Sequence, residues 1–187
     1  STIEGGSLIG ASTSFGSRGI RLEDVCQSYS GGVQVGVLFL PRNTIQNLDV
    51  GIEAIRSTVE VFNNDFINIV DINGINDGYA TLSIGDNSLP LRLQFGGGGS
   101  ALENSVTDCR YGIATSGVNR VQVTENIISS PLNAMKNGVS IRKALDVEVR
   151  ENDILDVGNI AVWVKQCLSF AGVTGLFIEL CQFSLSG

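Results

Sequence analysis

Val-Gln-Val-Thr-Glu-Asn-Ile-Ile, residues 121–128, and Val-Glu-Val-Arg-Glu-Asn-Asp-Ile, residues 147–154, share one frame. Two apolar residues alternate with polar ones, an asparagine follows three places after the second, and another apolar residue stands two places beyond it. A repeat built from such alternation, with a period of about 22 residues, is typical of a β-solenoid with one coil per repeat. Asparagines occupy this position at spacings of 21, 23, 17, 22 and 26 residues: Asn43, Asn64, Asn87, Asn104, Asn126 and Asn152.

Each coil is predicted to hold three short strands. One strand ends before the asparagine, one begins at it, and one follows a glycine further along the chain. Asparagine tolerates the left-handed backbone region at a sharp bend, and glycine suits a turn that needs a positive φ. Stacked coil on coil, the asparagine amides are expected to hydrogen-bond one another in a ladder. The expected starts of the third strand are Gly51-Ile52, Gly74-Ile75, Gly112-Ile113 and Gly138-Val139, with looser versions at Pro90-Leu91 and Asn159-Ile160.

Composition and charge exclude several functions. The chain has 187 residues, a formal net charge of −7 and no histidine. Its negative charge argues against binding to nucleic acid or to an anionic membrane, and no apolar run is long enough for a membrane span. The absence of histidine removes the commonest general base and zinc ligand, and we predict no metal and no cofactor. The cysteines show no metal-ligand spacing and are interpreted as small buried residues, with a disulfide such as Cys167–Cys181 left open: Cys26, Cys109, Cys167 and Cys181.

The two quoted stretches and Val-Glu-Val-Phe-Asn-Asn-Asp-Phe, residues 59–66, resemble the repeats of the pectin-lyase-like superfamily. The resemblance covers roughly residues 19–185. It implies an all-β fold, a right-handed single-stranded parallel β-helix of about seven to eight coils with an Asn ladder. The repeats at 43–54 and 109–114 are similar to those of large secreted or cell-surface proteins of the Bacteroidetes type, which implies a secreted or cell-surface location. We expect residues 1–187 to form a single domain, a segment of a longer chain.

Candidate ligand-binding residues lie on the expected outer face of the post-glycine strands, where enzymes of this superfamily hold substrate. Trp163, the only tryptophan, is a candidate sugar-stacking platform flanked by Arg142 and Lys165, a combination that favours an acidic glycan. The alternative is that Trp163 covers a turn or packs under residues 168–170. One outward column is expected to read Glu53, Asn76, Arg92, Ala114, Ser140 and Ala161. The candidate binding set is Trp163, Arg142, Lys165, Glu53 and Arg92.

These columns contain too few acids for catalysis. Hydrolysis of a glycosidic bond needs two flanking carboxylates, and a calcium-assisted lyase needs several clustered acids, whereas Glu53 is the one acid in the expected columns. We predict no catalytic residues and a non-catalytic extracellular stalk or adhesin segment that contacts polysaccharide or other surface proteins. The alternative is a polysaccharide lyase or glycoside hydrolase whose decisive residues lie outside this segment. The glycine run 96–99 is interpreted as a turn in the shortest coil, with Gly99 and Ala101 in positions that are bulky in other coils.

Overall fold

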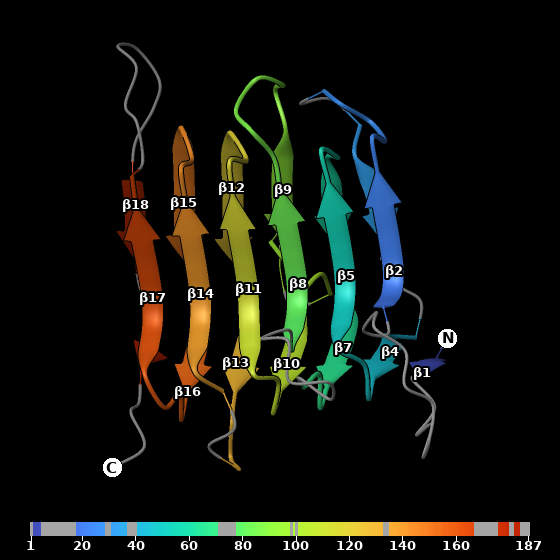
Figure 1. The fold of residues 1–187 in the computed structure, drawn as a ribbon. Coiled ribbons are helices and arrows are strands. Elements are labelled where there is room, and N and C mark those ends of the chain that lie inside the picture. The colour runs from blue at the N-terminus through green and yellow to red at the C-terminus, as the bar shows by residue number, and fades with distance from the viewer. Residues whose placement is uncertain are drawn as a thin grey trace.

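The computed structural model describes residues 2–4, 18–28, 31–36, 41–70, 78–97, 99, 101–132, 135–166, 176–179 and 182–183. These residues form strands β1 to β19 and contain no helix. All strand pairs are parallel, and the strands make three sheets of seven, six and six strands. The sheets wrap around one axis, and the chain advances along it as a right-handed coil (Figure 1).

Each sheet takes one strand from every coil. Sheet A contains β1 (Thr2–Glu4), β4 (Asn43–Gln46), β7 (Asn64–Ile67), β10 (Ser105–Thr107), β13 (Ile127–Ser129), β16 (Asp153–Leu155) and β19 (Gln182–Phe183). Sheet B contains β2 (Arg18–Glu23), β5 (Val50–Ile55), β8 (Tyr79–Ile84), β11 (Tyr111–Ser116), β14 (Asn137–Arg142) and β17 (Ile160–Lys165). Sheet C contains β3 (Val33–Val35), β6 (Val59–Val61), β9 (Arg92–Phe95), β12 (Arg120–Thr124), β15 (Asp146–Arg150) and β18 (Leu176–Glu179).

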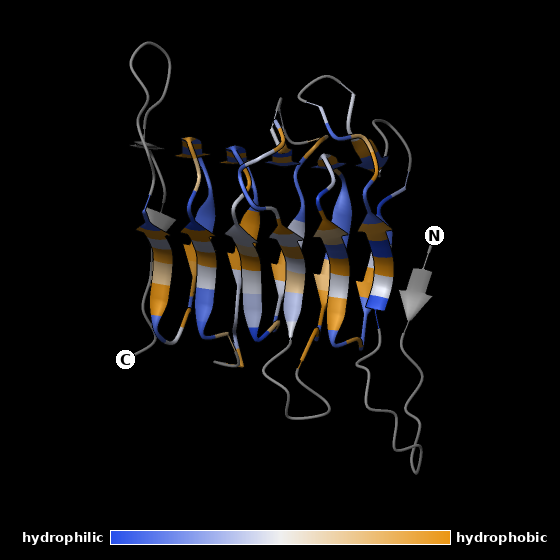
Figure 2. Cartoon of the chain, turned by 45° about the horizontal axis from the view of Figure 1, so that its top comes forward, coloured by the Kyte–Doolittle hydropathy of each residue, from blue (hydrophilic) through white to orange (hydrophobic). Residues whose placement is uncertain are grey.

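The strand order confirms the predicted parallel β-helix. The chain visits sheets A, B and C in turn, so each strand pairs with the strands three before and three after it. The described strands make six complete coils and the first strand of a seventh, slightly fewer than the seven to eight expected. Hydropathy alternates along the strands, as expected when successive side chains point into the rod and out of it (Figure 2).

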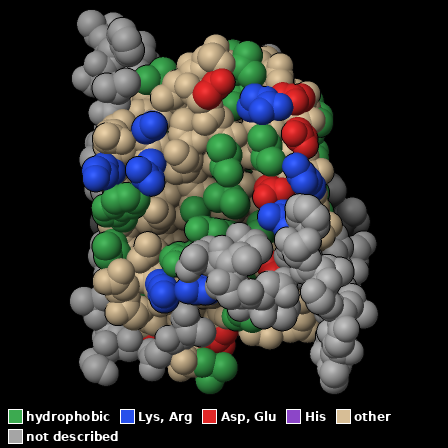
Figure 3. All heavy atoms as spheres, viewed as in Figure 1, with side chains coloured by type: hydrophobic (Ala, Val, Ile, Leu, Met, Phe, Trp, Pro, Cys, Tyr) green, Lys and Arg blue, Asp and Glu red, His purple; other side chains and the backbone are tan. Residues whose placement is uncertain are grey.

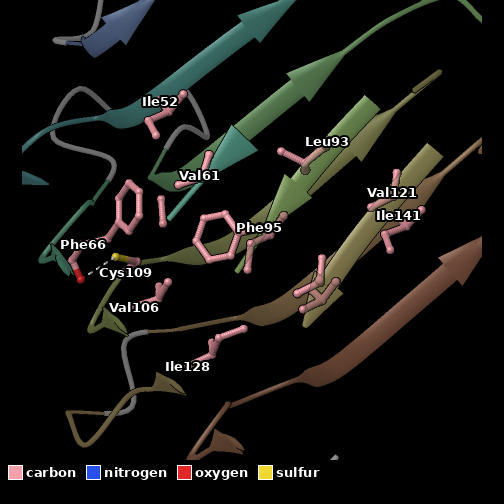
Figure 4. Close-up of a cluster of buried hydrophobic side chains, with 14 of the residues drawn as sticks. Ile52, Val61, Phe66, Leu93, Phe95, Val106, Cys109, Val121, Ile128 and Ile141 are labelled. Atoms are coloured by element: carbon pink, nitrogen blue, oxygen red, sulfur yellow. Dashed lines mark hydrogen bonds between the residues drawn. The ribbon is translucent and has the colours of Figure 1, made fainter. Parts of the chain in front are cut away.

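The interior is a continuous column of buried apolar side chains (Figure 4). Phe66 from β7 and Phe95 from β9 are the largest fully buried side chains, with ring centroids 5.7 Å apart. Their coil supplies only small inward residues from β8, Thr81 and Ser83, which are fully buried. Large side chains from sheets A and C therefore take the space that small side chains in sheet B leave, which keeps the interior close-packed.

Five of the six predicted asparagines form the ladder at the corner between sheets C and A. Each side-chain nitrogen donates to the side-chain oxygen of the next coil: Asn43 to Asn64 at 3.1 Å, Asn64 to Asn104 at 3.2 Å, Asn104 to Asn126 at 3.1 Å, and Asn126 to Asn152 at 2.9 Å. The amide also holds the turn around it, since Asn126 Nδ2 donates to the carbonyls of Thr124 and Phe95, both at 2.9 Å. Amide stacking therefore ties consecutive coils together.

Asn87 is not part of the ladder, and this prediction is wrong. Asn87 lies in the turn between β8 and β9 with φ of 67°, and its N–H donates to the carbonyl of Gly117 at 3.0 Å. The inward pair of this coil is Leu93 and Phe95 in β9, and Asn104 follows Phe95 by nine places where the frame has three, so the stretch 96–103 contains an insertion of six residues.

The expected roles of Gly99 and Ala101 are wrong for the same reason. Both residues belong to this insertion, Gly99 with φ of 104° and both exposed, and neither fills an interior position. The bulky positions are occupied by Leu93 and Phe95, which are fully buried, so the coil is not thinned here.

A column of small residues runs along sheet B near the start of each strand. A Cβ atom on Gly112 would lie 2.2 Å from the carbonyl oxygen of Gly138 in the next coil. The predicted glycine signal is confirmed at Gly51, Gly112 and Gly138, but its cause is the close approach of two backbones and not a positive φ. Gly74 and Ile75 lie outside the described residues, and the prediction at Pro90-Leu91 is wrong because these residues precede β9 of sheet C. Alanine occupies the same column at Ala80 and Ala161, where no glycine marks the strand.

Candidate functional site

Three outward columns cover the outer face of sheet B, and their register follows from the strand pairing. The first is Arg18, Val50, Tyr79, Tyr111, Asn137 and Ile160. The second is Arg21, Glu53, Leu82, Ala114, Ser140 and Trp163. The third is Glu23, Ile55, Ile84, Ser116, Arg142 and Lys165.

This register corrects the predicted columns in the last coil. Trp163 lies beside Ser140, and Lys165 lies beside Arg142. Ala161, which was expected in the outward column, belongs to the column of small residues. Asn76 lies outside the described residues.

Arg92 is not on this face, which contradicts the prediction. It belongs to β9 in sheet C, where it registers with Arg120 and forms an ion pair with Glu60. Burial, with a smaller contribution from the charge of Arg120, lowers the pKa of Arg92 below its usual range. Its guanidinium is therefore engaged on a different side of the rod from Trp163.

Trp163, Arg142 and Lys165, three of the predicted candidates, do meet. The guanidinium carbon of Arg142 lies 5.8 Å from the centroid of the half-buried Trp163 ring, within the range of a cation–π contact. Lys143 joins them at the end of β14, and its N–H donates to the carbonyl of Lys165 at 3.0 Å. The side chains of Arg142, Lys143 and Lys165 are exposed, and no carboxylate of the described residues forms an ion pair with them.

We call Trp163, Arg142, Lys143 and Lys165 the tryptophan cluster. Sequence reasoning missed Lys143, because an alternation pattern assigns no direction to a residue just past the end of a strand. Figure 3 shows Lys and Arg side chains gathered over the β14–β17 side of the face, apart from the acidic side chains.

Glu53 lies at the other end of the face and is held by arginines. Its carboxylate accepts from Arg18 Nε at 2.9 Å and lies 3.4 Å from Arg21 Nε, and the residue is only 6% exposed. Glu53 therefore fixes the first two coils to each other and presents little surface to a ligand. The prediction that it binds ligand has no support in this arrangement.

A second aromatic cluster was not predicted. The rings of Tyr79 and Tyr111 stack with centroids 4.7 Å apart, and the guanidinium carbon of Arg110 lies 5.7 Å from the Tyr111 centroid. Lys136 of the next coil is exposed, and its N–H donates to the carbonyl of Arg110 at 2.7 Å. We call these four residues the tyrosine cluster. The available signal was the tyrosine that opens both β8 and β11.

No group of three or more acidic, cysteine or histidine residues within the described part of the chain is placed to hold a metal ion. In the same part, no helix is long and apolar enough to cross a membrane. No family model, curated protein or solved structure significantly matches the chain.

Proposed function

We propose that this chain is a non-catalytic section of a β-helix rod that binds carbohydrate on the outer face of sheet B. The observation that carries the proposal is the tryptophan cluster, where an outward indole ring lies under Arg142 and beside the exposed Lys165. An indole offers a flat apolar surface for the apolar face of a sugar ring, and unpaired cations attract its carboxylate or sulfate groups. The ligand favoured by this combination is an acidic glycan.

The placement of the acids supports a binding role over a catalytic one. On the outer face of sheet B the described acids are Glu23 and Glu53, both in the first two coils and both within ion-pair distance of Arg21. None is near the tryptophan cluster, where a hydrolase would need two carboxylates flanking the bond to be cleaved. The proposal includes a stalk or adhesin role in a secreted or cell-surface protein of the pectin-lyase-like, Bacteroidetes type, which rests on the sequence resemblance.

The test is a glycan array followed by affinity measurements on the glycans that bind. Trp163→Ala and Arg142→Gln should each weaken binding about tenfold, because a ring contact or a desolvated cation contributes about 1–2 kcal/mol. Arg21→Gln is the matched control on the same face, and it should leave affinity unchanged. Full affinity in Trp163→Ala, with an unchanged urea midpoint, would remove the proposal. Release of shorter products from an acidic polysaccharide would favour a lyase or hydrolase instead.

A further inference from the structure

Two separate clusters on the same half of sheet B combine an aromatic ring with cations. In the tryptophan cluster the Arg142 guanidinium lies over an indole ring, and in the tyrosine cluster the Arg110 guanidinium lies over the Tyr111 ring. The two clusters lie at opposite ends of their strands, since Arg142 ends β14 and Tyr111 begins β11. Figure 3 shows a second group of Lys and Arg side chains near the lower edge of the face, in addition to the group over β14 and β17.

The surface between the clusters is formed by short and mostly polar side chains. Ser140 lies beside Trp163 in register, Asn137 lies beside Tyr111, and Ala114 lies beside Ser140. These are short side chains, whereas the column of Ala114 and Ser140 carries Leu82 in β8. A chain-like ligand can therefore lie against the strands here, with Ser140 and Asn137 as hydrogen-bonding partners.

The separation of the clusters matches an oligomer better than a single sugar. From Tyr111 to Trp163 the path crosses two strand spacings, about 10 Å, and three residues along the strand, also about 10 Å. The direct distance is therefore about 14 Å, more than one pyranose ring can span. A ligand that contacts both rings has to be a chain of several units.

The charges on this face of sheet B favour a negatively charged ligand. Arg142, Lys143, Lys165 and Lys136 are exposed, and no carboxylate of the described residues pairs with them. At the other end of the face the arginines are already paired, Arg18 with Glu53 and Arg56 with Asp24. Since the chain as a whole carries a formal net charge of −7, the unpaired cations form a local exception where a polyanion is attracted.

We propose that the two clusters are the ends of one extended site, which binds an acidic oligosaccharide lying diagonally across β11, β14 and β17. This inference rests on the proposed function and deepens it, because it specifies a polymer with repeated negative charges instead of a single acidic sugar. One charged unit lies at Arg142 and Lys165, and a later unit of the same chain lies at Lys136, beside the Tyr111 ring. The tyrosine cluster then adds affinity only for ligands long enough to reach it.

The experiment measures the affinity of the intact protein for galacturonic acid as a monosaccharide, a disaccharide and a hexasaccharide. Lys136→Gln should weaken hexasaccharide binding about tenfold and leave monosaccharide binding unchanged. Arg142→Gln should weaken both ligands. Arg120→Gln, on the outer face of sheet C and paired there with Asp146, is the matched control and should change neither.

The outcomes separate this inference from the proposed function. If Lys136→Gln leaves hexasaccharide affinity intact while Arg142→Gln lowers it, the extended site is wrong and the proposed function stands. If Trp163→Ala changes the affinity of none of the ligands, the proposed function fails and the inference fails with it. Equal affinity for a hexasaccharide whose carboxylates are reduced to alcohols would overturn the charge argument. Tighter binding to a single-stranded oligonucleotide of matched length would replace the glycan with a nucleic acid.

Discussion

Buried polar side chains occur in two regions of the rod, and the two regions treat them differently. At the corner between sheets C and A, Asn64, Asn104 and Asn126 are at most 2% exposed, and each amide bonds to the next coil. On the inner face of sheet B, Thr81, Ser83 and Thr115 are at most 3% exposed, and their hydroxyls have no hydrogen-bond partner among the described residues.

The difference comes from repetition combined with the length of the side chain. A polar residue at the ladder position meets another one in each neighbouring ladder coil, so every buried amide is satisfied by register alone. Thr81 instead lies between Ile52 and Ile113, which offer no polar group. Its small size serves the packing of Phe66 and Phe95, while its hydroxyl remains a cost of about 1–3 kcal/mol. Ser83 and Thr115 are neighbours in register, yet neither hydroxyl has a partner, so a repeated buried polar group is satisfied only where its side chain also reaches the next coil.

Removing a ladder amide should have the largest effect. Asn126→Ala removes the oxygen that accepts from the backbone N–H and the side-chain nitrogen of Asn104, both at 3.1 Å, and it removes one of the two donors to the side-chain oxygen of Asn152. We expect a loss of about 4 kcal/mol in the free energy of unfolding in urea, since each orphaned buried group costs about 1–3 kcal/mol. Asn159→Ala, at an exposed asparagine, is the control and should change stability by less than about 0.5 kcal/mol. A loss below 1 kcal/mol in Asn126→Ala would show that the ladder is incidental to stability.

Cys109 is an intermediate case and gives a pH-dependent test. Its thiol is fully buried and reaches the carbonyls of Phe66 at 3.8 Å (Figure 4) and Thr107 at 3.6 Å, long distances for a weak donor. Burial raises the pKa of Cys109 from 9.0 to about 12. The folded state therefore favours the neutral thiol, so its stability contribution is complete below pH 9 and is lost as the pH rises towards 12.

At pH 10.5 this loss amounts to about 2 kcal/mol relative to pH 8. Urea unfolding of the wild type and of Cys109→Ala at both pH values measures it, because the variant lacks the titrating thiol. The stability difference between the two proteins should shrink by that amount at high pH, whereas Cys26→Ser, at an exposed cysteine, should show no such change. A pH-independent difference would mean that the thiol ionises in the folded state as readily as in the unfolded chain.

A pair of matched substitutions gives the smallest effects, with opposite signs. Thr115→Val keeps the shape and removes a buried hydroxyl without a partner, so it should stabilise the fold by about 1 kcal/mol. Thr58 is equally buried, but its hydroxyl donates to the carbonyl of Ser28 at 2.8 Å and accepts from the N–H of Arg92 at 3.2 Å. Thr58→Val should therefore destabilise by about 1–2 kcal/mol. The urea midpoints at constant m-value decide it, and equal signs for both variants would contradict the comparison.

The sequence predicted the strands correctly where the apolar positions of the repeat frame point into the interior. The prediction failed where outward residues fit the same frame. The runs 121–128 and 147–154 carry inward Val121, Val123, Val147 and Val149, so the ladder positions at Asn126 and Asn152 were correct. In the third coil the outward Leu82 and Ile84 mimic an inward pair. Nothing in a single strand pattern distinguishes the two faces of such a sheet, and the insertion after β9 displaced the next asparagine.

The sequence predicted which residues form the tryptophan cluster, with the exception of Lys143, but it did not predict the register of β17 against β14. Trp163, Arg142 and Lys165 do share one surface, because strand alternation sends all three outward. The expected column placed Ala161 beside Ser140, where Trp163 lies, because a search for glycine before each strand overlooks Ala161, which fills the same position with another small side chain. The tyrosine cluster could not be found, because the contact between Arg110 and Tyr111 depends on a turn and not on alternation.

The asparagine ladder allows the rod to gain or lose whole coils. Every link joins one asparagine to an identical one, so excising or duplicating the stretch from one ladder residue to the next regenerates the same joint. The intervals differ, with 22 residues from Asn104 to Asn126 and 26 from Asn126 to Asn152, yet both close with a bond of similar geometry at 3.1 and 2.9 Å. A gene encoding this chain can therefore gain or lose whole turns, lengthening or shortening the protein by about 4.8 Å each time, without new chemistry at the seam.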